Sequence, residues 1–374
     1  MATEPTSMWQ PDWGVPPGEI LLEALQERAM TQSELARRMD RPLKTINEIV
    51  KGKAAITPET AIQLERALGI SARVWNGLEA NYREHLARQQ SLRDLERDAP
   101  WVDRFPIKDL VRHGLLRRGA TKAGTLAELL AFFRVSSPSA WERHWSERSV
   151  LFRSSPAFAA SPHAVAAWLR WGEIEASELS AAPFDARRFH DVLKTIRNLT
   201  RQPFPTVFNR VREMCAAVGV VVVATPELEG TRLSGAARWL APDKALIQLS
   251  LRHKSEEQVW FSFFHEARHL LRPTRHRDFV DAADEDDDNH DQDVEEQEAD
   301  GFARNLLIPL GDYHAFCRRG NFSATAVRAF AEEQGIAPGI AVGRLQHDKL
   351  VTPPQLNSLK RPLQWAKAPR SSKG

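Results

Sequence analysis

The chain has 374 residues, which is enough for two or three domains. It contains no apolar run of transmembrane length and no basic-then-apolar signal at its N-terminus, so we expect no membrane partner and a cytoplasmic location. The two cysteines, Cys215 and Cys317, form no paired motif, so we expect no disulfide framework and a reducing compartment.

The net charge of +2 conceals a strong segregation of charge. Residues 278–300 hold thirteen Asp and Glu side chains and no Lys or Arg. The other residues carry 51 basic and 36 acidic side chains, a net charge of +15. We therefore expect most of the surface to favour anionic partners, whereas one segment is strongly acidic.

Residues 16–90, which follow a tail formed by residues 1–15, predict a domain of five short helices. Thr31 and Glu34, three positions apart, form a capping box that opens one helix. Pro42 stands at the first position of the next helix, after a tight turn. Two short helices joined in this way, the second exposing polar residues, are typical of a helix-turn-helix.

Six side chains of this domain are candidates for contacts with double-stranded DNA. Those near the start of the second helix are expected to contact base edges in the major groove: Lys44, Thr45 and Asn47. Those expected to contact phosphates are Gln32, Lys51 and Lys53. Residues 1–100 carry 13 basic and 15 acidic side chains, so the positive charge here is a local cluster and not a property of the whole domain.

The order of signals over residues 30–53 closely resembles Cro/cI-type repressors of the XRE family. Residues 56–61 and 75–82 resemble the HigA-type antitoxin branch of that family. The resemblance implies a homodimer that binds a palindromic operator, often in its own promoter. The predicted helix over residues 72–88 would then serve as a dimer or linker helix.

Residues 91–200 are helical in pattern and rich in Trp, Arg and Ala, and we assign them to a helical linker or middle domain. No catalytic constellation occurs there. Four tryptophans at helical spacing are predicted to form core and not a ligand cage: Trp141, Trp145, Trp168 and Trp171.

A C-terminal domain is predicted over residues 201–350, and it opens with a small β-sheet. Residues 218–223 are a run typical of a buried strand, and residues 238–241 and 245–250 predict two more strands joined by a turn. The sequence does not indicate which strand lies at the edge of the sheet.

A metal-binding motif follows in a strongly apolar helical stretch. His265 and His269 lie four positions apart, so on an α-helix both imidazoles can point at one metal ion. Glu266 lies about 100° further round the helix, where a carboxylate can take a proton from water. Two nitrogen ligands with an adjacent glutamate are typical of zinc peptidases, provided that a third ligand exists.

Residues 295–309 predict an amphipathic helix that supplies this third ligand. Glu296 and Asp300 lie four positions apart on one face of it, so we assign Glu296 as the ligand and Asp300 as hydrogen-bond support for a ligating histidine. Glu295 and Glu298 are the competing ligand candidates.

The two motifs together resemble the ImmA/IrrE metallo-endopeptidases over roughly residues 205–350. The resemblance implies a zincin-like domain and a protein substrate, such as a repressor. In that family the first Glu of the second motif is a metal ligand, and it maps to Glu296 here. The expected Zn²⁺ ligands are thus His265, His269 and Glu296, with Glu266 as the catalytic base. The family usually has Gly where this chain has Arg268, whose bulk beside His265 is expected to narrow or modify the cleft.

The acidic segment, assigned to residues 278–295, lies between the two metal motifs and is expected to form a solvated loop. One alternative is a calcium loop of the EF-hand kind, with ligands at Asp284, Asp286, Asp288 and Glu295. Another is a flap that imitates substrate or DNA over a basic surface.

Two further helices over residues 324–334 and 339–347 are expected to close the domain, and residues 351–374 form a tail. The chain is thus predicted to be mainly α with a small β-sheet, of the α+β class. The leading hypothesis is a DNA-binding regulator that carries a zinc endopeptidase. The alternatives are a non-catalytic antitoxin or autorepressor whose C-terminal domain binds only metal, a partner protein or a cognate toxin, and an inactive interaction scaffold.

Overall fold

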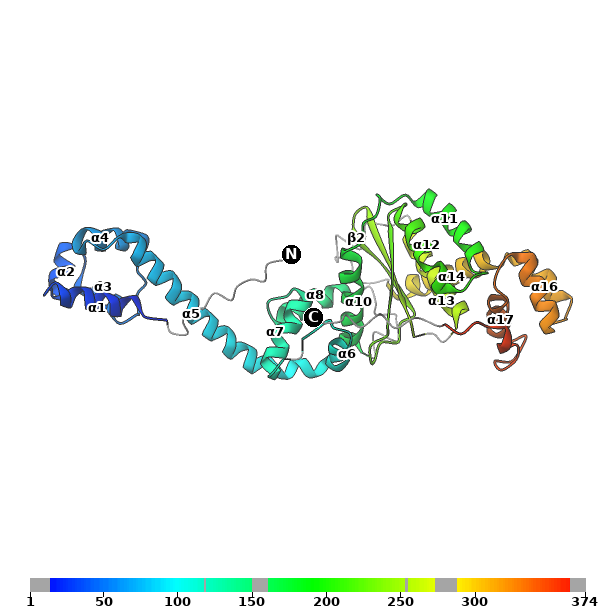
Figure 1. The fold of residues 1–374 in the computed structure, drawn as a ribbon, viewed down its shortest axis with the longest axis horizontal. Helices are drawn as coiled ribbons and strands as arrows, with labels where there is room; N and C mark the ends of the chain where they lie inside the picture. Colours follow the sequence, from blue (N-terminus) through cyan, green and yellow to red (C-terminus); the bar gives the residue numbers. More distant parts are fainter. Residues whose placement is uncertain (1–13, 118, 150–160, 253–254, 273–287, 364–374) are drawn as a thin grey trace. The chain divides into compact units, whose positions relative to one another are not determined.

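The computed structural model describes residues 14–117, 119–149, 161–252, 255–272 and 288–363. The chain divides into two compact units (Figure 1). One comprises Met1–Pro100 and Thr121–Gly124, and the other Trp101–Ala120 and Thr125–Gly374. Within the described ranges, no helix combines the length and the apolarity needed to cross a bilayer.

The first unit contains the five helices that the sequence predicts before residue 100. They are α1 (Pro17–Glu27), α2 (Gln32–Arg38), α3 (Leu43–Val50), α4 (Pro58–Leu68) and α5 (Ala72–Asp98). The side-chain oxygen of Thr31 accepts a hydrogen bond from the backbone N–H of Glu34 at 3.1 Å, which confirms the capping box. The last helix continues to Asp98, past its predicted end at residue 88.

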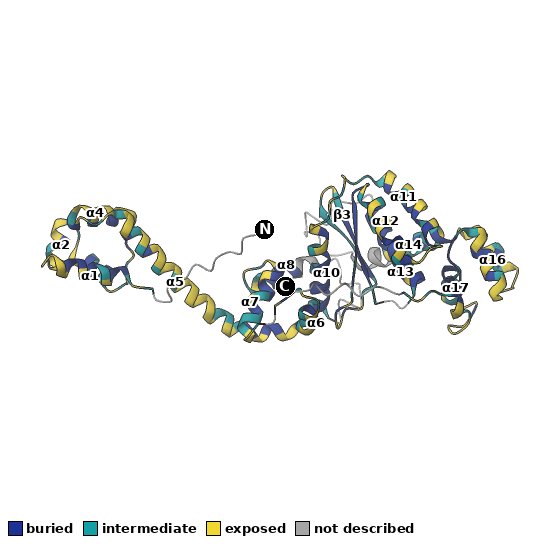
Figure 2. Cartoon of the chain, viewed as in Figure 1, coloured by how far each residue is buried: buried dark blue, intermediate teal, exposed yellow. Residues whose placement is uncertain are grey.

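The core of this unit is formed by the apolar faces of all five helices, drawn dark blue in Figure 2. Its fully buried side chains include Leu21, Leu35, Ile46, Leu64 and Trp75. A Cβ atom at Gly18 would lie 2.4 Å from the backbone oxygen of Val50. Only glycine therefore allows α1 to approach the end of α3 this closely.

The second unit opens with helices that pack around aromatic side chains. They are η1 (Ala99–Arg104), α6 (Ile107–Arg112), α7 (Lys122–Phe133), α8 (Pro138–Ser149) and α10 (Pro162–Ser177). The four tryptophans that the sequence predicts as core are at most 6% exposed, so that prediction is confirmed.

The sheet has three strands in the order β1-β3-β2. Their bounds are β1 (Val220–Thr225), β2 (Gly235–Ala241) and β3 (Lys244–Ser250). β1 pairs with β3 in parallel and β2 pairs with β3 antiparallel. All three strands were predicted, but β2 begins at Gly235, three positions earlier than its apolar pattern indicates.

The sheet lies between two layers of helices. Val220 and Val222 of β1 belong to the large core that contains α12 and α13, whereas Val221 and Val223 pack with Ala176 of α10. This alternation follows from the two-residue period of a strand. It explains why β1 is a continuous apolar run: both of its faces are covered.

The remaining helices surround the core on one side of the sheet. They are α11 (Ala186–Leu199), α12 (Phe204–Ala216), α13 (Glu256–Leu270), α14 (Asp288–Leu307), α15 (Leu310–Arg318), α16 (Ala324–Gln334) and α17 (Pro338–His347), followed by η3 (Asn357–Leu359). α13 is anchored by Trp260, Phe263 and Phe264, each fully buried. The mainly helical α+β class is confirmed.

α14 begins at Asp288, so residues 288–295, expected to belong to the acidic loop, are helical instead. Asp288 and Glu295 of the alternative calcium loop lie in this helix, which is incompatible with the open turn that such a loop requires. Asp284 and Asp286 lie outside the described residues.

The segment after α17 holds the beginning of α13 in place. The backbone N–H of Glu256 donates to the oxygen of Arg361 at 3.0 Å, and Lys360 Nζ lies 3.1 Å from Glu257 Oε1. Ser255 forms a bridge with Pro362. The first part of the expected tail, up to residue 363, is therefore packed against the metal-motif helix.

Candidate metal centre

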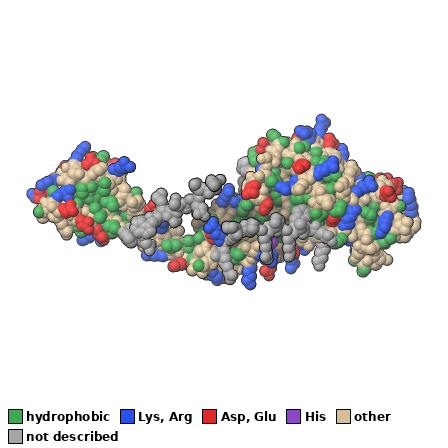
Figure 3. All heavy atoms as spheres, in the orientation of Figure 1, with side chains coloured by type: hydrophobic (Ala, Val, Ile, Leu, Met, Phe, Trp, Pro, Cys, Tyr) green, Lys and Arg blue, Asp and Glu red, His purple; other side chains and the backbone are tan. Residues whose placement is uncertain are grey.

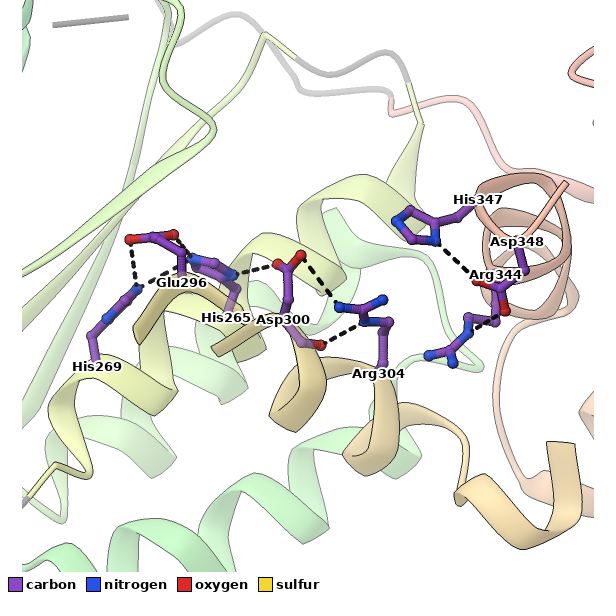
Figure 4. A network of polar contacts seen from close by, with 8 residues as sticks. All are labelled: His265, His269, Glu296, Asp300, Arg304, Arg344, His347 and Asp348. Carbon is purple, nitrogen blue, oxygen red and sulfur yellow. Dashed lines mark hydrogen bonds and ion pairs between the residues drawn. The ribbon is translucent and has the colours of Figure 1, made fainter. Parts of the chain in front are cut away.

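His265 and His269 lie one turn apart on α13, and their imidazoles point to the same side (Figure 4). The two Nε2 atoms are 3.2 Å apart. This confirms what the four-residue spacing predicts for the backbone geometry of a helix. The apolar residues around them fix the helix in the core and so set the direction in which both rings point.

Glu296 joins the pair from α14. Its Oε2 lies 3.1 Å from Nε2 of His265, and its Oε1 lies 3.6 Å from Nε2 of His269. One ligand atom from each of the three residues lies within 4.8 Å of the others. The structure therefore brings together the three side chains that the two motifs single out.

The two competing acids of α14 are engaged elsewhere. Glu298 forms an ion pair with Arg268, 3.1 Å between Oε2 and Nη2, and Glu295 pairs with Arg272. Of the three candidates, Glu296 alone has its carboxylate against both imidazoles.

Asp300 supports the site from one turn further along α14. Its Oδ1 lies 2.9 Å from Nδ1 of His265 (Figure 4). This contact leaves Nε2 of His265 directed toward Glu296 and His269. Arg304 in turn holds Asp300: its Nε donates to the backbone oxygen at 3.0 Å, and its Nη2 lies 3.5 Å from Oδ2. The sequence had not indicated this arginine.

The two histidines differ in their pKa values. Burial acts to lower the pKa of His265, but the hydrogen bonds that its ring donates to Asp300 and Glu296 outweigh burial and raise this pKa to about 10. Burial lowers the pKa of His269 to about 4. The pKa values of Glu296 and Asp300 are lowered chiefly by their hydrogen bonds to His265. Both carboxylates are therefore ionised at neutral pH, and their negative charge favours a cation at the ligand set of His265, His269 and Glu296.

Glu266 is buried beneath the edge of the sheet. Burial raises its pKa to about 7, opposed by the charge of His265 and by a backbone hydrogen bond from Ala237 of β2. A Cβ atom at Gly235 would lie 2.8 Å from Cγ of Glu266 and 2.9 Å from its Oε1. A carboxyl group of this pKa can both accept and return a proton near neutral pH.

Gly235 and Ala237 are functional neighbours that the sequence analysis missed. The available signal was the glycine at the start of a strand, which often marks a close approach of another group. Its partner could not be named, because Glu266 lies on a different element.

Arg268 is directed to α14 and α11 and not into the ligand set. Besides its ion pair with Glu298, it borders a surface groove with His190 of α11 and Phe302 of α14. From the sequence, the bulk of Arg268 was expected to narrow or modify the metal cleft. Its side chain instead connects α13 to α14.

Tyr313, which lies just beyond the second motif, is engaged away from the ligands. Its hydroxyl group donates to Asp348 at 2.7 Å, and the residue is 4% exposed. It therefore has no hydroxyl proton to offer at the metal centre.

In the first unit, the six candidate DNA contacts lie on α2, on α3 and just after α3. Lys44, Lys51 and Lys53 are exposed, and Gln32, Thr45 and Asn47 are half-buried. Lys44 Nζ lies 3.8 Å from Glu48. Figure 3 shows basic and acidic side chains intermixed on the visible face of this unit, in agreement with its nearly balanced charge.

Comparison with known proteins identifies both modules. Residues 21–75 match the helix-turn-helix family, and residues 215–343 match the IrrE N-terminal-like domain of a peptidase family. The uncharacterized HTH-type transcriptional regulator YddM of Escherichia coli K12 is 40% identical over 63 residues, which is 17% of this chain and 67% of that protein.

Two similar solved structures each cover about a quarter of this chain. The antitoxin HigA of Pseudomonas aeruginosa, solved with the higBA promoter, is 31% identical and covers 23% of this chain and 95% of its own, with a TM-score of 0.22. An addiction module antidote protein of a HigA family from Coxiella burnetii is 29% identical over 23% of this chain and 94% of its own, with a TM-score of 0.21.

The two family matches and the identity to YddM confirm the resemblances to XRE-family helix-turn-helix regulators and to the IrrE-type domain. The chain belongs to the HTH-type transcriptional regulators of the XRE family, and it joins that module to an IrrE N-terminal-like peptidase domain.

Proposed function

We propose that this protein is a transcriptional regulator that binds operator DNA through α2 and α3 and carries a zinc-dependent endopeptidase in its second unit. The observation that supports the peptidase is the convergence of His265, His269 and Glu296, with ligand atoms within 4.8 Å, beside the buried Glu266. The proposed substrate is a protein such as a repressor.

The donor set fits zinc. Two imidazole nitrogens and one carboxylate oxygen are typical of catalytic zinc sites, which keep a further position open. When bound, zinc would polarise a peptide carbonyl group and lower the pKa of water toward neutrality. Asp300 supports the ligand geometry, because it holds Nδ1 of His265 and leaves Nε2 for the metal.

Glu266 is the proposed proton carrier. Its carboxylate would accept a proton at Oε from the water that attacks the peptide carbonyl carbon. It would return this proton to the amine nitrogen as the C–N bond breaks. A pKa near 7 suits both steps, since neither protonation state is strongly favoured at neutral pH. The close contact with Gly235 restricts the positions that this carboxylate can take.

β2 is the proposed docking strand for the substrate. The strand order places it at one edge of the sheet, and it packs against α13. An extended peptide could add to this edge through backbone hydrogen bonds, which would place it next to Glu266. The predicted substrate class is therefore an unfolded or extended segment of a protein.

For the first unit, we propose that Lys44, Thr45 and Asn47 contact base edges and that Gln32, Lys51 and Lys53 contact phosphates. As a homodimer, the protein would place one α3 in each half-site of a palindromic operator. Membership of the HTH-type transcriptional regulators supports this assignment.

The test combines elemental analysis with a cleavage assay on a panel of purified helix-turn-helix repressors. We expect about one zinc per chain and cleavage of at least one repressor. Glu266→Gln should keep the zinc and lose cleavage by roughly 10²–10⁴-fold. Retained cleavage in this variant would reject its role as the base. Zinc without any cleavage would instead support the non-catalytic antitoxin or autorepressor, whose second unit binds metal, a toxin or another partner.

A further inference from the structure

Two ion pairs connect α13 and the segment just after it to α14, beside the metal ligands. Arg268 Nη2 lies 3.1 Å from Oε2 of Glu298, and Arg272 pairs with Glu295. The side chains of Arg268 and Arg272 are 27% and 25% exposed and those of Glu298 and Glu295 are 52% and 33% exposed, so both pairs are partly open to solvent.

One pair involves α13 itself, and the other involves the segment just after it. Arg268 follows His265 by three positions on α13, whereas Arg272 lies two positions after the helix ends at Leu270. On the helix, Arg268 lies about 60° round the axis from His265. Arg268 and His265 therefore face the same partner helix, α14, and Arg272 reaches that helix from beyond the end of α13.

On α14, the paired acids flank the ligand. Glu295 immediately precedes Glu296, and Glu298 follows it by two positions. Rotation of α14 by one residue, about 100°, would bring a different acid to the imidazoles and would break both ion pairs. The arginines thus engage the two acids that could otherwise compete for the metal.

We propose that Arg268 and Arg272 are positioning residues that fix the rotation of α14, so that Glu296 and neither neighbouring acid completes the metal site. This inference rests on the metal centre of the proposed function. Arg268 would then help to build the metal site. The identity of the third ligand would depend on ion pairs between residues that do not bind the metal.

The test measures zinc affinity in the full chain by competition with a chromophoric chelator. Arg268→Ala and Arg272→Ala should each weaken binding by about 2- to 5-fold, as expected for partly exposed ion pairs. The double variant should lose about tenfold, the lower range for groups that orient metal ligands. Exchange of the charges, Arg268→Glu with Glu298→Arg, should return the affinity to within about twofold of the wild type.

Arg104→Ala is the matched control, because Arg104 forms an ion pair at the same 3.1 Å with Glu142 and both residues lie on elements that carry no ligand. This variant should keep wild-type affinity. Circular dichroism and thermal unfolding of each variant separate loss of fold from loss of positioning.

Cobalt substitution provides a second measurement, which would not change if the two arginines only stabilised the fold. If α14 changes its rotation, the visible absorption bands of bound Co²⁺ should change in the double variant, since a different oxygen donor replaces Glu296. Wild-type affinity together with unchanged bands in the double variant would overturn the inference. In that case, loss of zinc in His265→Ala would still support the metal centre. A wild-type chain that binds no zinc would reject both the metal centre and the positioning role of the arginines.

Discussion

The α2–α3 pair and the α13–α14 pair are both built from two helices that present polar side chains, but they are assembled over very different lengths of chain. The six candidate DNA contacts lie between Gln32 and Lys53, within one short segment. The metal centre joins His265 to Asp300 across a strongly acidic segment. The first site depends on local turn and capping chemistry, whereas the second exists only when two distant helices pack together.

Removal of a metal ligand should have the largest effect and should separate the two sites. His265→Ala or Glu296→Ala is expected to weaken zinc binding by at least about 100-fold, beyond the loss caused by groups that only orient ligands. Operator binding by the first unit should stay unchanged, because none of its candidate contacts belongs to the metal centre. Elemental analysis and gel-shift titration measure the two effects.

The counterpart on α3 is Asn47→Ala, tested on a duplex selected by the wild-type chain from a randomised library. It should weaken binding by about 1–3 kcal/mol and relax preference at one base pair. Lys51→Ala should weaken binding to all sequences alike and reduce the salt dependence. Arg93→Ala, an exposed residue late in α5, is the control. Equal losses in all three variants would contradict the assignment of α3 as the recognition helix.

Zinc affinity should increase with pH. Because the pKa of His265 is raised to about 10, its imidazole is protonated in the metal-free protein at neutral pH, and zinc must displace that proton. His269, with a pKa of about 4, is already neutral there. We expect affinity to rise by up to about tenfold per pH unit between pH 6 and 9.

Asp300→Asn provides the control for this pH dependence. It removes the carboxylate that stabilises the protonated ring, so the rise in affinity should level off near the ordinary histidine pKa of about 6.5. Titrations of both proteins at a series of pH values make the comparison. A flat profile in the wild type would show that His265 holds no proton for zinc to displace.

Two glycines should give the smallest and most selective effects. Gly235→Ala would force a Cβ atom against Glu266 and should impair cleavage while zinc stays bound. Gly301→Ala on α14 meets nothing within 4 Å and should stabilise the protein by about 0.5–1 kcal/mol, through better helix propensity. Thermal unfolding and cleavage assays distinguish the two. Impaired cleavage in both variants would weaken the argument from the Gly235 contact.

Much of the fold follows from short-range patterns. The five helices of the first unit follow from capping residues, prolines and apolar spacing, and the three strands follow from apolar runs and a turn. The start of α14 was misplaced because the acidic residues from Asp288 onward carry no apolar stripe. The first part of α14 continues a helix whose later residues pack in the core, so this part forms without an amphipathic pattern of its own.

The sequence alone determined that two imidazoles face one point, because a helix repeats every 3.6 residues whatever surrounds it. It also predicted, through resemblance, which acid joins them. Only the packing of α14 on α13 decided that Glu295 and Glu298 form ion pairs away from the metal ligands, and that Arg268 is the partner of Glu298. Likewise, only the packing of β2 against α13 brought Gly235 next to Glu266. Those outcomes depend on contacts between elements that no local spacing encodes, and so they required the tertiary structure.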